Sequence, residues 1–124
     1  MPIKNILVVD DSPTDRQQLS DILSKGGYNV STAASAEEGI AKVKAAKPDL
    51  VLMDVVMPGQ NGYQATRELS KDDATKSIPV ILCTSKNQET DKVWGMRQGA
   101  KAYITKPFTE NQLVEVINSL LVPG

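Results

Sequence analysis

The sequence predicts an α/β fold in which five short strands form a parallel sheet with five helices packed against it. Apolar runs of strand length alternate with amphipathic stretches of helix length along the chain, which is the pattern of repeated βα units. Polar residues follow several of the apolar runs directly, as they do where the carboxyl ends of parallel strands form one edge of an open sheet. The expected strands cover residues 5–10, 28–33, 49–54, 79–84 and 101–105.

Start and stop signals define the first two helices. Ser12 is suited to cap the first helix and Pro13 to occupy its first position, and the two glycines at 26–27 end it. Ser35, with Glu38 three residues later, forms a capping-box signature for the second helix. The expected inward residues of these helices are Leu19, Ile22, Leu23, Ile40 and Val43.

The other three helices are placed by loops and by apolar spacing. The third follows a loop at residues 57–62 and precedes a polar loop at 71–77. The fourth spans residues 88–98 and is ended by Gly99, and the fifth begins near Thr109. Their expected inward residues are Ala65, Thr66, Leu69, Leu113, Val116, Ile117, Leu120 and Leu121.

Length and composition restrict the possible classes of function. A chain of 124 residues with 40% hydrophobic and 23% charged residues matches one globular domain, so we expect a single domain over residues 1–124 without an output domain. The net charge of -1 does not indicate the basic surface that is typical of nucleic-acid-binding proteins. The chain shows no signal-peptide pattern, and no apolar run approaches the roughly 18 residues of a membrane span. We therefore expect a cytoplasmic protein that binds neither nucleic acid nor membrane.

Histidine is absent and there is one cysteine. The absence of histidine excludes histidine-based metal sites, Ser-His-Asp or Cys-His catalysis, and a phosphohistidine on this chain. Cys83 cannot form an internal disulfide and lies in an apolar run, so we expect a buried structural thiol. Any phosphoryl chemistry therefore needs a donor from outside the chain.

Four strand ends supply the groups that one phosphoryl site needs. Asp10 and Asp11 follow the first strand, and Asp54, Thr84 and Lys106 follow or end three later ones. Two like charges about 4 Å apart repel by about 4 kcal/mol at an effective dielectric near 20, so a carboxylate cluster favours a divalent cation, and oxygen ligands suit Mg²⁺. A carboxylate can then form an aspartyl-phosphate. The hydroxyl and the ammonium can bind the remaining phosphoryl oxygens.

Each of these residues, taken singly, also has a structural explanation. The acidic pair can cap the helix that follows it, and Asp54 can cap a turn. Thr84 can be present only because threonine favours β-strands. Lysine before proline is common in loops, although Pro107 allows a cis peptide bond that would direct Lys106 inward. The combination favours the phosphoryl site because four separate strand ends each contribute a residue type that such a site requires.

Four motifs carry a resemblance to a known family. They are VVDDS at residues 8–12, LMDVVMPG at 52–59, TS at 84–85 and YITKP at 103–107. With them the chain resembles, over essentially its whole length, the receiver domain of two-component response regulators, in the single-domain form typified by the chemotaxis regulator. The resemblance implies a doubly wound, flavodoxin-like receiver fold with strand order 2-1-3-4-5.

The same resemblance implies roles for individual residues. Asp54 would accept a phosphoryl group from a histidine kinase, Thr84 and Lys106 would bind that group, and Tyr103 would be the aromatic switch. The implied ligands of Mg²⁺ are Asp11, Asp54, the backbone carbonyl of Val56 and, through water, Asp10. The domain would act as a signalling switch rather than an enzyme, with self-catalysed phosphorylation and dephosphorylation only.

Phosphorylation can change a distant surface in such a domain. A phosphoryl group on Asp54 brings about -1.5 to -2 charges, and its oxygens attract the Thr84 hydroxyl. Movement of Thr84 toward the phosphoryl group opens space into which Tyr103 can turn. The surface formed by the fourth helix, fifth strand and fifth helix then shifts between two arrangements, and a downstream protein that prefers one arrangement reads the change.

A finer resemblance concerns residues 61–67 and 88–100. These stretches resemble the PilH-type regulators of the chemosensory pathway that controls type IV pilus twitching motility, and related phototaxis regulators. Trp94 within them is either a partly buried anchor of the fourth helix or a partner contact. The alternative role is that of a phosphate sink for a sibling regulator. Val56 and Lys86 differ from the chemotaxis type, and we expect them to tune the loss of phosphate.

Other α/β classes fit the sequence less well. A flavodoxin-like FMN carrier needs hydroxyls and amides in its first loop, whereas Asp10 and Asp11 would repel a phosphate in the absence of metal. A phosphatase or phosphomutase would place its nucleophile at the first strand end and need a cap or a larger chain. A dinucleotide-binding domain would need a G-x-G-x-x-G motif after a strand, which the sequence lacks.

Overall fold

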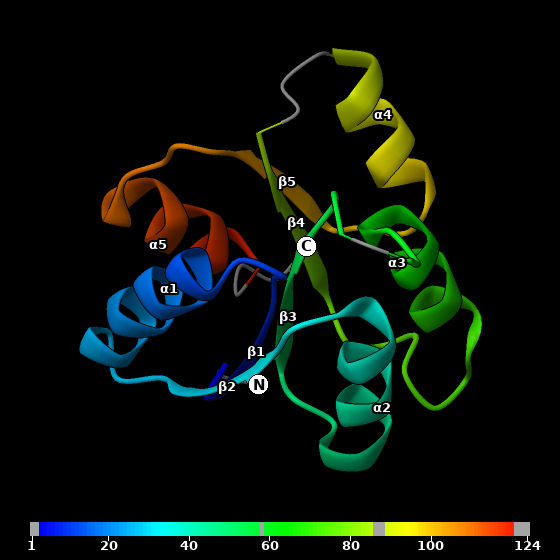
Figure 1. Cartoon of the computed structure of the whole chain (residues 1–124), viewed down its shortest axis with the longest axis horizontal. Helices are drawn as coiled ribbons and strands as arrows, with labels where there is room; N and C mark the ends of the chain where they lie inside the picture. Colours follow the sequence, from blue (N-terminus) through cyan, green and yellow to red (C-terminus); the bar gives the residue numbers. More distant parts are fainter. Residues whose placement is uncertain (1–2, 58, 86–88, 121–124) are drawn as a thin grey trace.

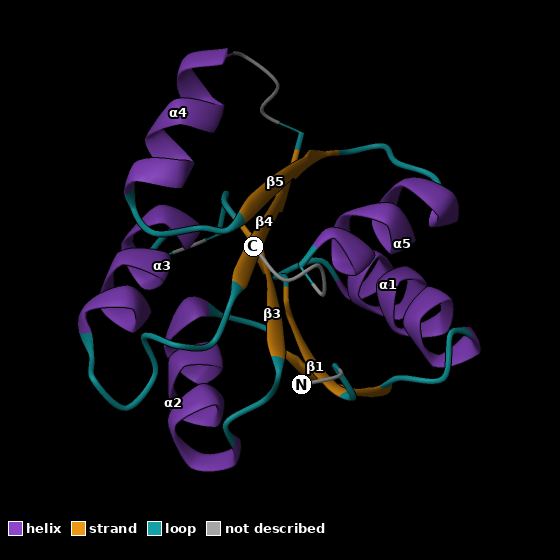
Figure 2. Cartoon of the chain, turned by 180° about the vertical axis from the view of Figure 1, so that it is seen from behind, coloured by secondary structure: helices purple, strands orange, loops and turns teal. Residues whose placement is uncertain are grey.

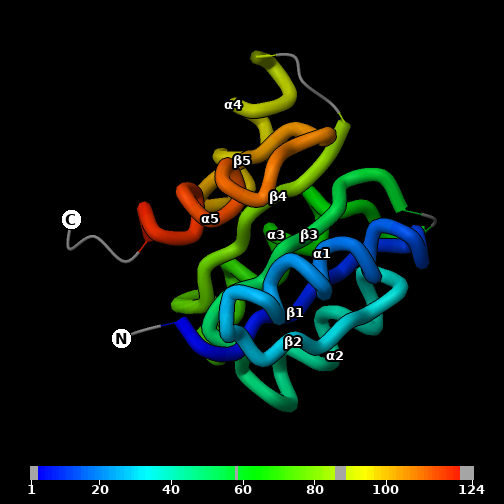
Figure 3. Tube along the Cα trace, turned by 90° about the vertical axis from the view of Figure 1, so that its left-hand side faces the viewer, coloured from blue at the N-terminus to red at the C-terminus, as the bar shows by residue number. Residues whose placement is uncertain are grey.

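A computed structural model of the chain describes residues 3–57, 59–85 and 89–120. Within these residues, five parallel strands form one sheet in the order β2-β1-β3-β4-β5, which confirms the predicted topology. Figure 3 shows the strands following one another in this order from β5 to β2. The strands are β1 (Asn5–Val9), β2 (Asn29–Ala33), β3 (Leu50–Asp54), β4 (Val80–Thr84) and β5 (Ala102–Thr105).

The helices lie on both faces of the sheet, as a doubly wound fold requires (Figures 1 and 2). One face is covered by α1 (Pro13–Lys25) and α5 (Glu110–Ser119). The other is covered by α2 (Ala36–Ala46), α3 (Gly62–Lys71) and α4 (Glu89–Arg97). Because strands β3 and β4 are buried along their whole length, their side chains pack against helices on both faces, which explains why these runs are apolar throughout.

Each face of the sheet has its own hydrophobic core. Neighbouring residues of a strand point to opposite faces, so β1 directs Ile6 and Val8 into the core under α1 and α5. It directs Leu7 and Val9 into the core under α2 and α3. Complete burial of such a side chain stabilises the fold by about 1.5–3 kcal/mol, so the apolar strands hold the sheet firmly between its two helical layers.

The predicted caps of the first two helices are present, with one difference. The hydroxyl of Ser12 accepts a hydrogen bond from the backbone N–H of Asp15 (3.3 Å), and that of Ser35 accepts one from Glu38 (3.1 Å). The Glu38 carboxylate, however, accepts from the N–H of Ala34 (3.0 Å), one residue before the position that a capping box requires. The expectation for Ser35 is thus confirmed, while the Glu38 half of the box was wrong by one residue.

Two complete capping boxes start the third and fifth helices, which the sequence interpretation had not specified. Asn61 exchanges hydrogen bonds with Gln64, and Thr109 with Gln112. Each box satisfies two backbone donors that a helix start leaves free. The strands after the first begin one residue later than expected, and the expected start of the fourth helix at 88 and the expected inward residue Leu121 lie outside the described residues.

The single cysteine is part of the core. Cys83 on β4 is buried, and burial raises the pKa of its thiol to about 12. It is therefore a structural thiol, as predicted. No helix within the described ranges combines the length and the apolar character that a membrane span needs.

Candidate functional site

The strand register brings the predicted site residues to one edge of the sheet. The pairing of β1 with β3 sets Asp10 at the level of Asp54, and the pairing of β3 with β4 sets Thr84 one residue beyond that level. Lys106 follows β5, and its backbone N–H donates a hydrogen bond to the carbonyl of Thr84 (2.8 Å). Four positions far apart in the sequence thus meet at the carboxyl edge, where open α/β sheets place their ligands.

Three carboxylates form a compact acidic cluster at this edge. Asp10, Asp11 and Asp54 each offer a carboxylate oxygen, and these oxygens lie within 4.8 Å of one another. Asp10 and Asp54 are buried, with exposed fractions of 1% and 8%, while Asp11 is exposed. Hard oxygen donors with one open side fit Mg²⁺, which keeps waters and leaves room for phosphate oxygens. The residues present therefore suit Mg²⁺.

The ammonium of Lys106 lies among several carboxylates. Its Nζ atom is 2.7 Å from Oδ2 of Asp10, 3.0 Å from Oδ2 of Asp15 and 3.7 Å from Oδ1 of Asp54. Partial burial lowers the pKa of Lys106, but the hydrogen bonds to Asp10 and Asp15 and the charge of Asp54 outweigh it, so the pKa stands above its usual value. The ammonium therefore stays protonated at neutral pH. The Lys106–Pro107 peptide bond is cis.

Asp10 is held in place by four hydrogen bonds, one of which its own backbone N–H donates to the carbonyl of Ala33 (3.1 Å). Its Oδ1 atom accepts one from the backbone N–H of Ser12 (2.9 Å) and its Oδ2 atom accepts one from Lys106. Its backbone carbonyl accepts one from Nη1 of Arg16 (2.7 Å). The start of α1 therefore fixes the buried carboxylate that faces Lys106.

Asp54 has an altered acidity because of its surroundings. Burial raises its pKa to about 6, the charges of Asp10 and Asp11 act in the same direction, and the charge of Lys106 opposes them. Desolvation and like charges both disfavour the ionised form of a carboxyl group. Above a pH of about 6, Asp54 is nonetheless a carboxylate, the form that can attack phosphorus.

The other two predicted residues of this edge differ in exposure. Thr84 is buried at the end of β4, one position beyond Asp54 in the sheet register. Val56 lies two residues after Asp54, and 58% of its surface is exposed. The assignment of its backbone carbonyl as a metal ligand stays a prediction, while its exposed side chain lies where solvent can reach it.

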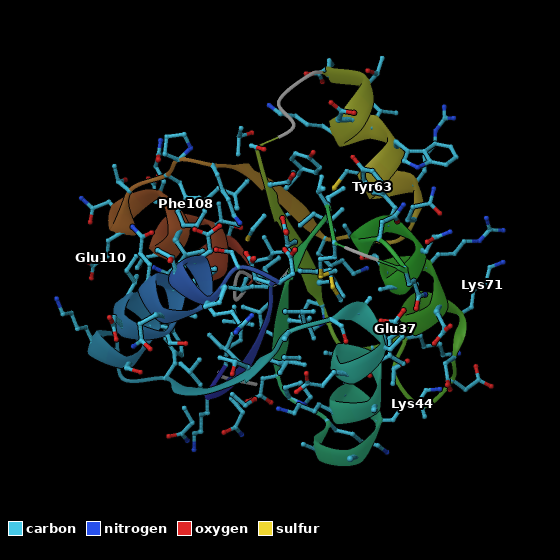
Figure 4. All side chains as sticks on the ribbon, viewed as in Figure 1. Glu37, Lys44, Tyr63, Lys71, Phe108 and Glu110 are labelled. Carbon is cyan, nitrogen blue, oxygen red and sulfur yellow. The ribbon has the colours of Figure 1, made fainter. Side chains whose placement is uncertain are left out.

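Tyr103 lies on the face of the sheet that carries α3 and α4. It packs against the core on that face, and its ring is so close to Gly95 of α4 that a Cβ atom there would stand 3.2 Å from the ring. Burial and a hydrogen bond with Tyr63 raise the pKa of the Tyr103 hydroxyl. Tyr63, which points from α3 toward α4 (Figure 4), donates from its own hydroxyl to the carbonyl of Asp91 (3.2 Å). The two tyrosines therefore connect β5, α3 and α4.

Asp15 is a site residue that the sequence interpretation missed. It occupies the first turn of α1, and its carboxylate contacts the ammonium of Lys106 at 3.0 Å. The sequence did contain a signal for Asp15, which stands about one helical turn after Asp11. A helix that starts at the sheet edge places the side chains of its first turn near that edge. Next to this ion pair is a hollow of about 300 Å³, lined by Asp15, Gln18, Leu19, Ile22, Ser85, Lys106, Pro107 and Phe108.

Comparisons with known proteins agree with this geometry. The family model for the response regulator receiver domain matches residues 6–118. The chain is 55% identical to PilH of Pseudomonas aeruginosa over 116 residues, which cover 94% of this chain and 96% of PilH. It is 38% identical to the chemotaxis protein CheY of Thermotoga maritima over 118 residues, 94% of this chain and 97% of CheY.

A solved structure gives the same result in three dimensions. A chain of the CheX-CheY-BeF3-Mg²⁺ complex from Borrelia burgdorferi superposes with a TM-score of 0.91 at 30% sequence identity. The match covers 97% of this chain and 90% of that one. The similarity thus extends over the whole sheet and both helical layers.

Proposed function

The chain belongs to the response regulator receiver family, and from this premise we propose that it is a signalling switch that accepts a phosphoryl group on Asp54. Receiver domains take phosphate from histidine kinases and act on downstream targets. The observation that carries the proposal is the meeting of a buried Asp54 with two further carboxylates and the ammonium of Lys106. A nucleophilic carboxylate, oxygen ligands for a cation and a fixed positive charge are what phosphoryl transfer to a side chain needs.

In the proposed transfer, a carboxylate oxygen of Asp54 attacks the phosphorus atom of a phosphohistidine. The new bond joins that oxygen to phosphorus while the bond between phosphorus and the imidazole nitrogen breaks. The leaving imidazole keeps the electron pair and takes a proton from solvent. Later attack by water returns the aspartate and inorganic phosphate, so the chain changes its own state and converts no further substrate.

The surrounding residues stabilise the charge that this transfer brings. The ammonium of Lys106, 3.7 Å from Oδ1 of Asp54, is placed to pair with a phosphoryl oxygen, and the hydroxyl of Thr84 is suited to donate to another. Mg²⁺, when held by Asp10, Asp11, Asp54 and the backbone carbonyl of Val56, would neutralise charge on the phosphoryl oxygens. The cluster of Asp10, Asp11 and Asp54 supports a cation site here, and the CheX-CheY-BeF3-Mg²⁺ complex from Borrelia burgdorferi contains Mg²⁺.

The proposed output surface lies over α4, β5 and α5. Val93, Trp94 and Met96 on α4 are exposed large apolar residues, with 52% of Trp94 accessible. Exposed apolar residues grouped on one element are typical of protein contacts, and this exposure favours a partner contact for Trp94 over an anchor role. The contact of Tyr103 with Gly95 is the route by which a change at the strand ends would reach α4.

The pathway follows from similarity. With 55% identity to PilH over nearly the whole length of both chains, we propose that the switch works in a chemosensory pathway for type IV pilus motility. The phosphodonor would be the histidine kinase of that pathway, and the downstream target a protein that binds the α4-β5-α5 surface.

The test is phosphorylation by acetyl phosphate in the presence of Mg²⁺, followed on a phosphate-retarding gel. The wild-type chain should show a retarded band that disappears with Asp54→Ala and on removal of the cation by chelation. A panel of histidine kinases then identifies the donor. A wild-type chain that takes no label from any donor, or an Asp54→Ala variant that takes as much as wild type, would refute the proposal.

A further inference from the structure

Lys106 has an acidic partner, Asp15, that is not one of the three clustered carboxylates Asp10, Asp11 and Asp54. Its Nζ atom lies 3.0 Å from Oδ2 of Asp15 but 3.7 Å from Oδ1 of Asp54. The ammonium therefore rests closer to Asp15 than to the proposed phosphoacceptor. Oδ2 of Asp10, at 2.7 Å, is the nearest carboxylate oxygen among its ion pairs.

The start of α1 builds Asp15 into this position. Ser12 caps the helix by accepting a hydrogen bond from the Asp15 backbone N–H (3.3 Å), and the same loop is tied to Asp10 through the Ser12 N–H (2.9 Å). A carboxylate in the first turn is also favoured by the helix dipole. The contact with Lys106 thus depends on a fixed helix start rather than on a freely moving surface side chain.

We propose that Asp15 is a positioning residue that holds the Lys106 ammonium in a resting place away from Asp54 and so slows phosphorylation. The inference rests on the proposed phosphoryl transfer to Asp54. When a phosphoryl group arrives, its oxygens need the ammonium, which must loosen its contact with Asp15. The chain thereby sets its own rate of activation through a residue that touches neither the phosphoryl group nor the cation.

The exposure of the pair determines the size of the effect. The side chain of Asp15 is 40% exposed and that of Lys106 20%, so water screens part of their attraction, unlike that between Lys106 and buried Asp10. We expect removal of the Asp15 charge to speed phosphorylation by about 3- to 5-fold, equivalent to about 0.7 to 1 kcal/mol at 1.36 kcal/mol per factor of ten. The hollow beside the pair leaves the ammonium room to move.

The first experiment measures initial phosphorylation rates with acetyl phosphate and Mg²⁺ in a double-mutant cycle. Asp15→Asn should accelerate labelling, while Asp15→Glu, which keeps the charge, should stay near the wild-type rate. Asp21→Asn is the control, because the Asp21 carboxylate lies on the same helix but accepts a hydrogen bond from Gln17. This variant should label at the wild-type rate. In a Lys106→Met background, Asp15→Asn should no longer accelerate labelling, because the effect acts through Lys106.

The second experiment needs neither donor nor cation. Nitrogen NMR of the Lys106 ammonium in chelator should show faster proton exchange with water in Asp15→Asn than in wild type, with Asp15→Glu close to wild type. Equal exchange in all three would refute the resting contact, and an unchanged labelling rate in Asp15→Asn would refute its effect on activation. Absence of any label on wild type is a different result, which refutes the proposed phosphoryl transfer while the NMR comparison still decides the resting contact.

Discussion

The backbone of Gly62 lies directly against the backbone carbonyl of Asp54. A Cβ atom at position 62 would stand 2.1 Å from that carbonyl oxygen and 2.9 Å from Cα of Val55. The N–H of Gly62 also donates a hydrogen bond to the carbonyl of Val55 (2.9 Å). The first residue of α3 is thereby packed onto the loop that follows the proposed phosphoacceptor, and any side chain at position 62 would push Asp54 away from its partners.

Gly62→Ala should therefore destabilise the protein by about 3 kcal/mol or more, because backbone atoms cannot yield as a flexible side chain can. The matched control is Gly27→Ala. A Cβ atom at position 27 would have nothing within 4 Å, so only the φ of +90° opposes an alanine there. We expect this backbone strain to destabilise the protein by about 1 kcal/mol. Urea unfolding compares the two, and a loss at Gly62 no larger than that at Gly27 would contradict the packing described.

The acidity of Asp54 should make stability depend on pH. Its folded pKa of about 6 lies above its ordinary value of 3.8, so the folded state binds the proton more tightly than the unfolded state. The stabilisation from this proton is complete below the ordinary pKa and is lost as the pH rises through about 6. In chelator, wild type should lose stability relative to Asp54→Asn across this range. A difference between the two that does not vary with pH would contradict the altered acidity.

Mg²⁺ should stabilise the folded chain by binding the acidic cluster. At a concentration of about 100 times the Kd, a ligand that binds only the folded state adds about 2.7 kcal/mol. Asp11→Asn should weaken this effect by removing one oxygen ligand charge. Asp73→Asn is the control, because Asp73 is exposed and pairs only with Lys76 among the residues described. Thermal unfolding with and without Mg²⁺ measures the rise in unfolding temperature that the cation causes in each variant. Equal rises in Asp11→Asn and Asp73→Asn would argue against the cluster as the metal site.

Val56 should influence how long the phosphoryl group lasts. Its apolar side chain is 58% exposed beside Asp54 and cannot orient an attacking water molecule, whereas an amide can hydrogen-bond one. Val56→Asn, alone and with Lys86→Glu at a position outside the described residues, should therefore change the rate of autodephosphorylation. Val93→Asn, at a position of 45% exposure on α4, controls for a polar substitution elsewhere. The measurement is the rate at which the phosphorylated band disappears on a phosphate-retarding gel. An unchanged half-life of the phosphorylated form in both Val56 variants would reject this role.

The strand order was implied by the family resemblance, while the edge that carries the acidic cluster was predictable from the repeating pattern of strands and helices. Alternating apolar strands and amphipathic helices, together with the family motifs, led to Asp10, Asp54, Thr84 and Lys106 at one sheet edge. The register of the sheet then places them within about two residues of one level along the strands. Such features tolerate small errors in element boundaries, which is why strands that begin one residue late changed nothing at the site.

The contacts of individual long side chains were not predictable in the same way. Whether Lys106 pairs with Asp15 or with Asp54 depends on a difference between 3.0 and 3.7 Å, which no spacing in the sequence encodes. The Glu38 carboxylate likewise reaches Ala34 instead of Ser35, because the turn before α2 and not the capping signature decides which N–H is nearest.

The buried thiol of Cys83 has a practical consequence. Because this cysteine is enclosed in the core and resists ionisation, a maleimide dye should leave it unmodified in the folded chain. A cysteine introduced at exposed Thr90 on α4 would then carry the only attached dye. Movement of that helix could be followed in real time by emission from a protein whose carboxyl edge is untouched.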